Sequence, residues 1–168
     1  AGGKLGGSAS FAGGAAATAK VLAALGVTTT GMELSDGSGL SRRDQVSPLT
    51  LAGTLAAVAS ARLPDALPSA APSGGGVATW PVSPGLPVAG FTGTLAERFD
   101  ASSVASARGL VRAKTGTLTG VQALAGLVRD KDGRLLTYAF LASEVPVKQE
   151  AQAALDKAAA IVAGCGCR

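Results

Sequence analysis

The sequence predicts an α+β fold in which helices flank an antiparallel sheet. Three observations support this prediction. An apolar stretch enters and leaves Lys114-Thr115-Gly116, which is typical of a strand, and a hairpin follows with strands at 121–128 and 135–142 around the turn Asp130–Gly133. Residues 147–162 then have the spacing of an amphipathic helix. Three consecutive antiparallel strands followed by a packing helix indicate the α+β class.

Two helices are expected before the sheet. Residues 14–25 are rich in alanine and leucine and have high helix propensity, with Gly26 as the stop. A serine followed by proline, Ser47-Pro48, predicts an N-cap and the first residue of a second helix. Between the two helices, residues 32–34 alternate in polarity and predict a short extended segment.

A long loop is expected at about 63–90, where proline occurs six times and three glycines follow one another. We interpret it as an excursion rather than a domain boundary, because the segments on either side cannot form complete folds. After the loop, Thr94 is predicted to cap a short helix at 95–99. In the last helix, Ala154 and Ile161 are expected on the buried side with Leu155. Residues 1–168 are thus interpreted as one portion of a single domain.

The composition excludes several classes of function. The formal net charge of +4 comes from scattered Lys and Arg, without the basic stripe and interleaved aromatic residues of a nucleic-acid surface. No stretch reaches the roughly 18 apolar residues of a membrane-spanning helix. The 168 residues include no histidine. Ser-His-Asp and Cys-His catalysis and the usual zinc sites are therefore excluded within this chain.

The two cysteines, Cys165 and Cys167, lie at the end of the sequence. Two thiols are too few for a structural zinc site, so no metal or other cofactor is expected. One intervening residue would strain a mutual disulfide, and pairing with another segment is an alternative. A terminal segment with free thiols is a third reading. Their pairing stays open at this stage.

The tripeptide Lys114-Thr115-Gly116 offers the chemistry of a substrate-binding strand. On a strand, Lys114 and Gly116 project to one side and Thr115 to the other. The ammonium attracts a carboxylate, Thr115 or Thr117 can donate a hydroxyl hydrogen bond to it, and a residue without Cβ lets another backbone approach. The alternative reading is an exposed strand with an ordinary lysine.

A second segment, residues 35–44, combines glycines, serines and two arginines. Gly37 and Gly39 allow a tight turn, and neighbouring Asp and Ser side chains can bond to their own backbone. Arg42 could offer its guanidinium to an anionic ligand. The alternative reading is an ordinary loop before a helix.

Together these motifs resemble a known family. The order is Asp-Gly-Ser-Gly-Leu-Ser-Arg at 36–42, a proline-started helix, Gly-Thr-Leu-Ala-Glu-Arg-Phe at 93–99, and Ala-Lys-Thr-Gly-Thr-Leu-Thr-Gly-Val at 113–121. This is similar to the D-alanyl-D-alanine carboxypeptidase/endopeptidase family often called penicillin-binding protein 4. The resemblance covers about residues 14–162 and implies the C-terminal part of a penicillin-binding-protein/serine β-lactamase-like fold.

The resemblance also implies site residues. Lys114, Thr115 and Gly116 match the Lys-Thr-Gly element of the catalytic site, and Thr117 follows as a carboxylate or oxyanion contact. Ser38 and Arg42 become candidate contacts for the carboxylate end of a diaminopimelate side chain, and Leu118 is a further pocket residue. Such enzymes acylate a serine with a peptidoglycan stem peptide and bind β-lactams. They act outside the cytoplasm, in the periplasm, cell wall or medium.

Two family elements are missing. No serine here has lysine three positions later, and the chain contains no asparagine for a Ser-x-Asn element. The resemblance therefore implies a C-terminal fragment whose nucleophile lies on a companion N-terminal segment. Two alternatives remain: a serine β-lactamase or esterase of the same superfamily, and a non-catalytic cell-wall-binding module.

Overall fold

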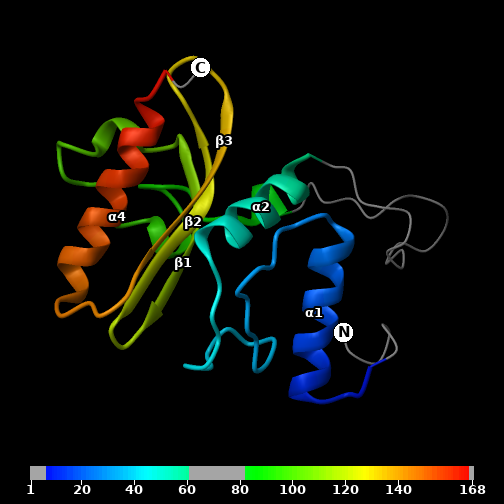
Figure 1. Cartoon of the computed structure of the whole chain (residues 1–168). Coiled ribbons are helices and arrows are strands. Elements are labelled where there is room, and N and C mark those ends of the chain that lie inside the picture. Colours follow the sequence, from blue (N-terminus) through cyan, green and yellow to red (C-terminus); the bar gives the residue numbers. More distant parts are fainter. Residues whose placement is uncertain (1–6, 61–81, 167–168) are drawn as a thin grey trace. The chain divides into compact units, whose positions relative to one another are not determined.

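The structure is a computed structural model that describes residues 7–60 and 82–166. The chain divides into two compact units, Ala1–Trp80 and Pro81–Arg168. Figure 1 shows the helices of the first unit in blue and cyan and the sheet of the second in green and yellow. Whether the two units are portions of one domain stays a prediction.

The first unit contains the two predicted helices. Helix α1 spans Phe11–Ala24 and begins earlier than expected, because the Ser10 hydroxyl accepts a hydrogen bond from the Gly13 N–H at 3.1 Å and caps it. The helix stops before Gly26, whose φ of 70° is the left-handed conformation that glycine accepts easily.

Helix α2 spans Pro48–Ala59 and begins as the sequence predicts. The Ser47 hydroxyl accepts from the Thr50 N–H at 3.0 Å, with Pro48 in the first turn. Thr50 is buried and donates its hydroxyl to the Thr28 carbonyl at 2.8 Å, which ties the helix to the preceding segment. The predicted extended segment at 32–34 is reduced to one bridge, Glu33 with Gln45.

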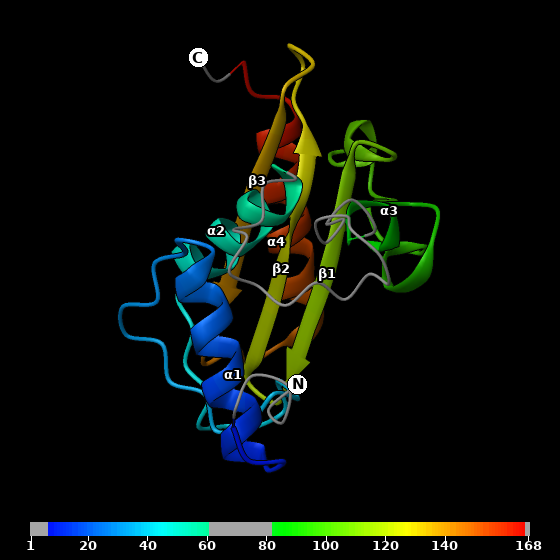
Figure 2. The same cartoon turned by 90° about the vertical axis from the view of Figure 1, so that its right-hand side faces the viewer.

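The second unit is built on a three-stranded antiparallel sheet in the order β1-β2-β3 (Figure 2). The strands are β1, Val111–Leu118, β2, Val121–Arg129, and β3, Leu135–Ala142. The turn between β2 and β3 lies where expected, because the buried Asp130 carboxylate accepts from the backbone N–H groups of Asp132 and Arg134. The hairpin and the α+β class are confirmed.

Helix α4, Lys148–Ala163, packs on one face of the sheet (Figure 2). Its Leu155, Ala159 and Ala163 join a core with buried side chains of all three strands and of the segment before β1: Ala89, Leu95, Phe99, Val104, Ala107, Val111, Ala113, Leu124, Val128 and Tyr138. The predicted buried side of the helix is wrong in part. Ala154 and Ile161 are exposed, whereas the charged Asp156 is buried.

Between Pro81 and β1 the chain forms short helical turns: α3, Val82–Gly85, and the 3₁₀ helices η2, Gly93–Leu95, and η3, Ala105–Ala107. The end of the predicted loop is thus ordered, while residues 63–81 of that prediction lie outside the described residues. The predicted cap at Thr94 is wrong, because Thr94 lies inside η2 and Thr92 precedes it.

The C-terminal cysteines are only partly described. Cys165 is disulfide-bonded, so the free-thiol reading is wrong for this residue. The other cysteine, Cys167, lies outside the described residues. No helix within residues 7–60 and 82–166 is long and apolar enough to span a membrane.

Candidate functional site

Strand β1 carries the Lys-Thr-Gly element, and the segment at 87–89 covers the first half of its outer edge. The segment before it pairs with this half: the Ala89 N–H donates to the Val111 carbonyl at 3.0 Å, and the Ala113 N–H donates to the Pro87 carbonyl at 2.9 Å. Backbone groups on a strand alternate in direction, so the N–H and C=O of Thr115 and Thr117 also face this edge.

From Thr115 onward, no backbone partner lies on this edge within residues 82–166. We call residues 114–118 the open edge. A strand edge with unpaired N–H and C=O groups can pair with another extended backbone. The cover therefore ends where the Lys-Thr-Gly element begins, and the geometry fits the addition of a peptide strand.

The side chains of the open edge divide between the two faces of the sheet. Every second side chain of a strand lies on the same face, so Thr115 and Thr117 share the face of the buried Val111 and Ala113, which α4 covers. The opposite face carries the other members of the set: Lys114, Gly116 and Leu118. The predicted separation of Lys114 and Gly116 from Thr115 is thus present.

Lys114 is exposed at the open edge, and its ammonium donates to the carbonyl oxygen of Thr115 at 2.7 Å. That carbonyl faces outward, so the lysine holds a positive charge beside the outward-facing backbone groups of the edge. A carboxylate that approached this edge would meet the cation at short range.

Gly116 lies opposite Ala123 in the pairing of β1 with β2. A Cβ at position 116 would lie 3.1 Å from the Ala123 Cβ, which is tighter than ordinary van der Waals contact. Glycine therefore serves the close approach of the two strands and keeps the open edge free of a side chain.

Thr115 has a hydroxyl partner that the sequence did not predict. Its Oγ1 donates to Oγ1 of Thr94, in η2, at 3.2 Å. In this bond the Thr94 hydroxyl accepts, so it can donate its own hydrogen to a ligand at the edge, and the Thr115 hydroxyl can do the same by exchanging this bond. No local pattern around Thr94 indicates this contact, which depends on how η2 lies against β1.

Thr117 is held from β2. Its Oγ1 donates to Oε1 of Gln122 at 3.2 Å, and the same oxygen accepts from Nε2 of Gln152, on α4, at 3.3 Å. Gln122 lies directly opposite Thr117 in the strand pairing and is buried. Neither glutamine was predicted from the sequence.

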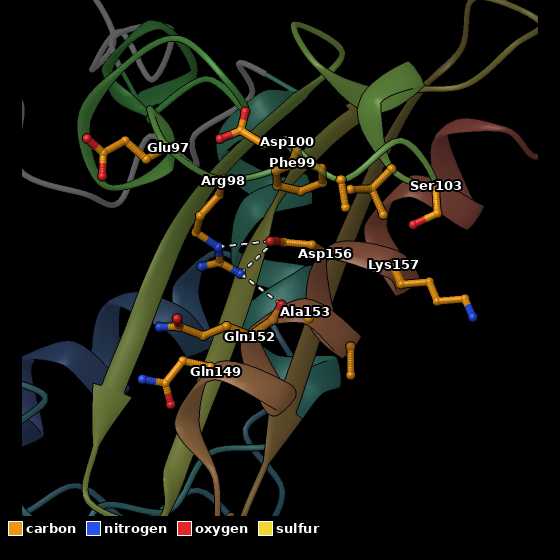
Figure 3. A pocket seen from close by; sticks show the side chains of 13 residues that line it. Glu97, Arg98, Phe99, Asp100, Ser103, Gln149, Gln152, Ala153, Asp156 and Lys157 are labelled. Atoms are coloured by element: carbon orange, nitrogen blue, oxygen red, sulfur yellow. Dashed lines mark hydrogen bonds and ion pairs between the residues drawn. The ribbon is translucent and has the colours of Figure 1, made fainter.

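Behind this group, a groove of about 460 Å³ lies between residues 97–104 and the first half of α4 (Figure 3). An ion pair lines it: Arg98 donates to the two carboxylate oxygens of Asp156 at 3.1 and 2.6 Å, and to the Gln152 carbonyl at 3.3 Å. Burial raises the pKa of Asp156 above its usual range, although Arg98 and the Phe99 N–H oppose that shift. This pair fixes α4 against the segment before β1.

Ser38 and Arg42 belong to the first unit, on the loop between the Glu33–Gln45 bridge partners. Ser38 donates both its backbone N–H (2.7 Å) and its hydroxyl (2.8 Å) to one carboxylate oxygen of Asp36. These two bonds, the backbone one foremost, lower the pKa of Asp36. The loop forms the predicted turn, and the Ser38 hydroxyl stabilises it. Arg42 is exposed.

The open edge can bind and orient an extended, anionic ligand. The outward N–H of Thr117 can stabilise a developing oxyanion, which is the largest single stabilising contribution in acyl transfer. Within the described part of the chain, no group of three or more His, Cys, Asp and Glu side chains could hold a metal ion.

Comparison with known proteins shows the family of the chain. Residues 1–162 match the model of the D-Ala-D-Ala carboxypeptidase 3 (S13) family. The chain belongs to this family. It is 37% identical over 159 residues to the carboxypeptidase DacB of Mycolicibacterium smegmatis, a match that covers 94% of this chain. It is 40% identical over 121 residues to a D-alanyl-D-alanine carboxypeptidase of an Actinomadura species, covering 69% of this chain and 19% of that protein.

The fold is shared with solved structures. Penicillin binding protein 4 of Haemophilus influenzae, complexed with a β-lactam, matches with a TM-score of 0.70 and 25% identity over 89% of this chain and 33% of that chain. The second unit is therefore the sheet and C-terminal helix of a penicillin-binding-protein-like fold. The chain spans only about a third of such relatives, with 31% of the Mycolicibacterium DacB carboxypeptidase matched.

Proposed function

We propose that this chain is the C-terminal part of a serine D-Ala-D-Ala carboxypeptidase, with endopeptidase activity as a second proposed activity of the same site. One observation supports this most strongly: within residues 82–166 the outer edge of β1 is covered up to Ala113 and open from Thr115, so a peptide strand can add beside Lys114, Thr115 and Gly116. Family membership supports the same reaction.

In this proposal the chain binds and orients the substrate. A stem peptide ending in D-Ala-D-Ala lies along the open edge, with its terminal carboxylate beside Lys114 and the hydroxyls of Thr115 and Thr94. The Thr117 N–H donates to the carbonyl oxygen under attack, and the negative charge that develops there strengthens the bond. A β-lactam occupies the same edge through its own carboxylate.

The nucleophile comes from elsewhere in the proposed enzyme. A companion N-terminal segment carries Ser-x-x-Lys and Ser-x-Asn, because this chain contains neither. The serine hydroxyl forms an ester with the penultimate D-Ala, and the terminal D-Ala leaves with its amine protonated. Water then hydrolyses the ester and restores the serine.

Three further residues are proposed to select the stem peptide. Ser38 and Arg42 contact the distal carboxylate of a diaminopimelate side chain, and Leu118, on β1, is a further substrate-lining residue. The guanidinium of Arg42 suits a carboxylate because it can donate two parallel bonds. The substrate is a cell-wall polymer, so the proposed location is extracytoplasmic: the periplasm, the cell wall or the medium.

Release of D-Ala from a synthetic stem pentapeptide tests this function in the intact polypeptide. We expect one D-Ala to be released for each pentapeptide consumed. We also expect a penicillin to stay covalently bound for much longer than one turnover of the peptide takes. Fast hydrolysis of a chromogenic cephalosporin without D-Ala would favour the β-lactamase or esterase alternative. Reproducible absence of any polypeptide segment with Ser-x-x-Lys, by mass spectrometry, would favour a non-catalytic wall-binding module.

A further inference from the structure

Gln122 is a buried polar side chain directly behind the open edge. It lies on β2 opposite Thr117, on the face that α4 covers, and only 3% of its surface is exposed. A buried amide must satisfy its hydrogen-bonding groups inside the protein, or it costs stability. Its partners therefore show what it holds in place.

The orientation of the Gln122 amide is fixed by three bonds. Its Nε2 donates to the Val121 carbonyl at 2.8 Å, so the amide oxygen is turned toward β1 and α4. That oxygen accepts from Thr117 Oγ1 at 3.2 Å and from Gln152 Nε2 at 3.3 Å. Two donors occupy the two lone pairs of the oxygen, and a flipped amide would instead turn its oxygen toward the Val121 carbonyl, which cannot donate a hydrogen bond.

The hydrogen bonds of Gln122 continue into α4 through Gln152. The backbone carbonyl of Gln152 accepts from Arg98 at 3.3 Å, and Arg98 is paired with Asp156. Hydrogen bonds therefore lead from the ion pair to Gln152, from Gln152 to Gln122, and from Gln122 to Thr117 at the open edge. Thr117 is thus connected through Gln122 and Gln152 to the ion pair on α4.

We propose that Gln122 is a positioning residue for the acyl-transfer reaction, acting through Thr117; this inference rests on the proposed function. By accepting the Thr117 hydroxyl hydrogen, Gln122 fixes the side-chain rotamer of Thr117 and restrains the end of β1. The backbone N–H of Thr117 is then held toward the outer edge before the substrate arrives. Fixed donors of this kind lower the barrier because they need no reorganisation as charge develops.

The proposal separates two hydroxyls that look equivalent in the sequence. The Thr115 hydroxyl is bonded to an exposed neighbour, Thr94, and can exchange that bond for a ligand. The Thr117 hydroxyl donates its hydrogen to the buried Gln122 amide oxygen, so this hydrogen is held inside the protein rather than offered to a ligand. Loss of Gln122 should therefore affect kcat, whereas substrate binding, as reflected in KM, should change little.

The test uses the intact enzyme and the Gln122→Met variant, which keeps the side-chain length but removes the acceptor. We expect kcat for D-Ala release to fall about 3- to 10-fold, the equivalent of one lost hydrogen bond, with KM changed by less than about twofold. Gln149→Met is the matched control, because Gln149 is an exposed glutamine of α4 outside this set of bonds. It should retain the kcat of the unmodified enzyme.

A second comparison shows whether Gln122 acts through Thr117. In a Thr117→Val background, the Gln122→Met exchange should reduce kcat no further, because the hydroxyl that it positions is already gone. If Gln122→Met does not fold at the assay temperature, Gln152→Met replaces it in both backgrounds. That half-buried change removes one of the two donors to the Gln122 oxygen.

The outcomes are distinct. An unchanged kcat in Gln122→Met, or an equal loss in both backgrounds, would overturn the positioning role while leaving the carboxypeptidase proposal intact. If the unmodified enzyme neither releases D-Ala nor is acylated by penicillin, the proposed function itself fails and the inference fails with it.

Discussion

The buried ion pair between Arg98 and Asp156 makes a quantitative prediction. The Arg98 side chain is 14% exposed and that of Asp156 10%, so water screens the pair little. Arg98→Met keeps the aliphatic stem but leaves Asp156 without its cation. Removal of one partner from a buried pair typically costs about 3–5 kcal/mol. At the lower value we expect the Tm to fall by about 6–12 °C, using 2–4 °C per kcal/mol for a domain of this size.

The loss should depend on pH. Burial already holds the pKa of Asp156 above its usual range, and Arg98 opposes the shift, so the pKa rises further without Arg98. A carboxyl whose pKa is higher in the folded than in the unfolded state contributes stability below the unfolded pKa, and that contribution is lost as pH rises through the folded pKa. The difference in Tm between variant and unmodified protein should therefore grow between about pH 4 and pH 7.

Thermal melts followed by circular dichroism at both pH values measure this effect. Arg129→Met is the control, because Arg129 is an exposed arginine at the end of β2 and its loss should change Tm by about 2 °C or less. An Arg98→Met loss that is equal at the two pH values, or no larger than that of the control, would refute the reasoning.

Two further variants test the proposed substrate contacts. Gly116→Ala should reduce kcat/KM for D-Ala release by about tenfold or more, because its Cβ lies 3.1 Å from the Ala123 Cβ and displaces the open edge; wild-type kinetics would contradict the close fit of β1 and β2. Arg42→Gln should reduce the preference for diaminopimelate-containing over lysine-containing stem peptides by about tenfold, through loss of a charge-assisted bond. An unchanged preference ratio would remove Arg42 from the pocket.

Local signals in the sequence predict much of the fold. Ser47-Pro48 begins α2, and the Asp130–Gly133 turn joins β2 to β3, because each depends on bonds within four residues. The Lys-Thr-Gly strand is likewise predicted by its own apolar flanks. Where the bond that fixes an element lies within a few residues, the local sequence pattern is sufficient to predict that element.

Contacts between distant segments could not be predicted in the same way. Arg98 and Asp156 are 58 positions apart in the sequence. The helical pattern predicted Ile161 on the buried side, and it did not indicate that Asp156 would be buried while Ile161 is exposed. Gln122 interrupts an apolar strand, but its role depends on the register that puts Thr117 opposite it. The sequence around Thr94 predicts a helix cap. Its contact with Thr115 could not be predicted, because it depends on the tertiary fold.

The most direct test of the central claim is acylation of the intact preparation by a fluorescent penicillin, with the labelled peptide identified by mass spectrometry. The account predicts a covalent label on the serine of a Ser-x-x-Lys element outside residues 1–168, and competition by a D-Ala-D-Ala stem peptide. No label on any polypeptide, or a label on a serine within this chain, would contradict it.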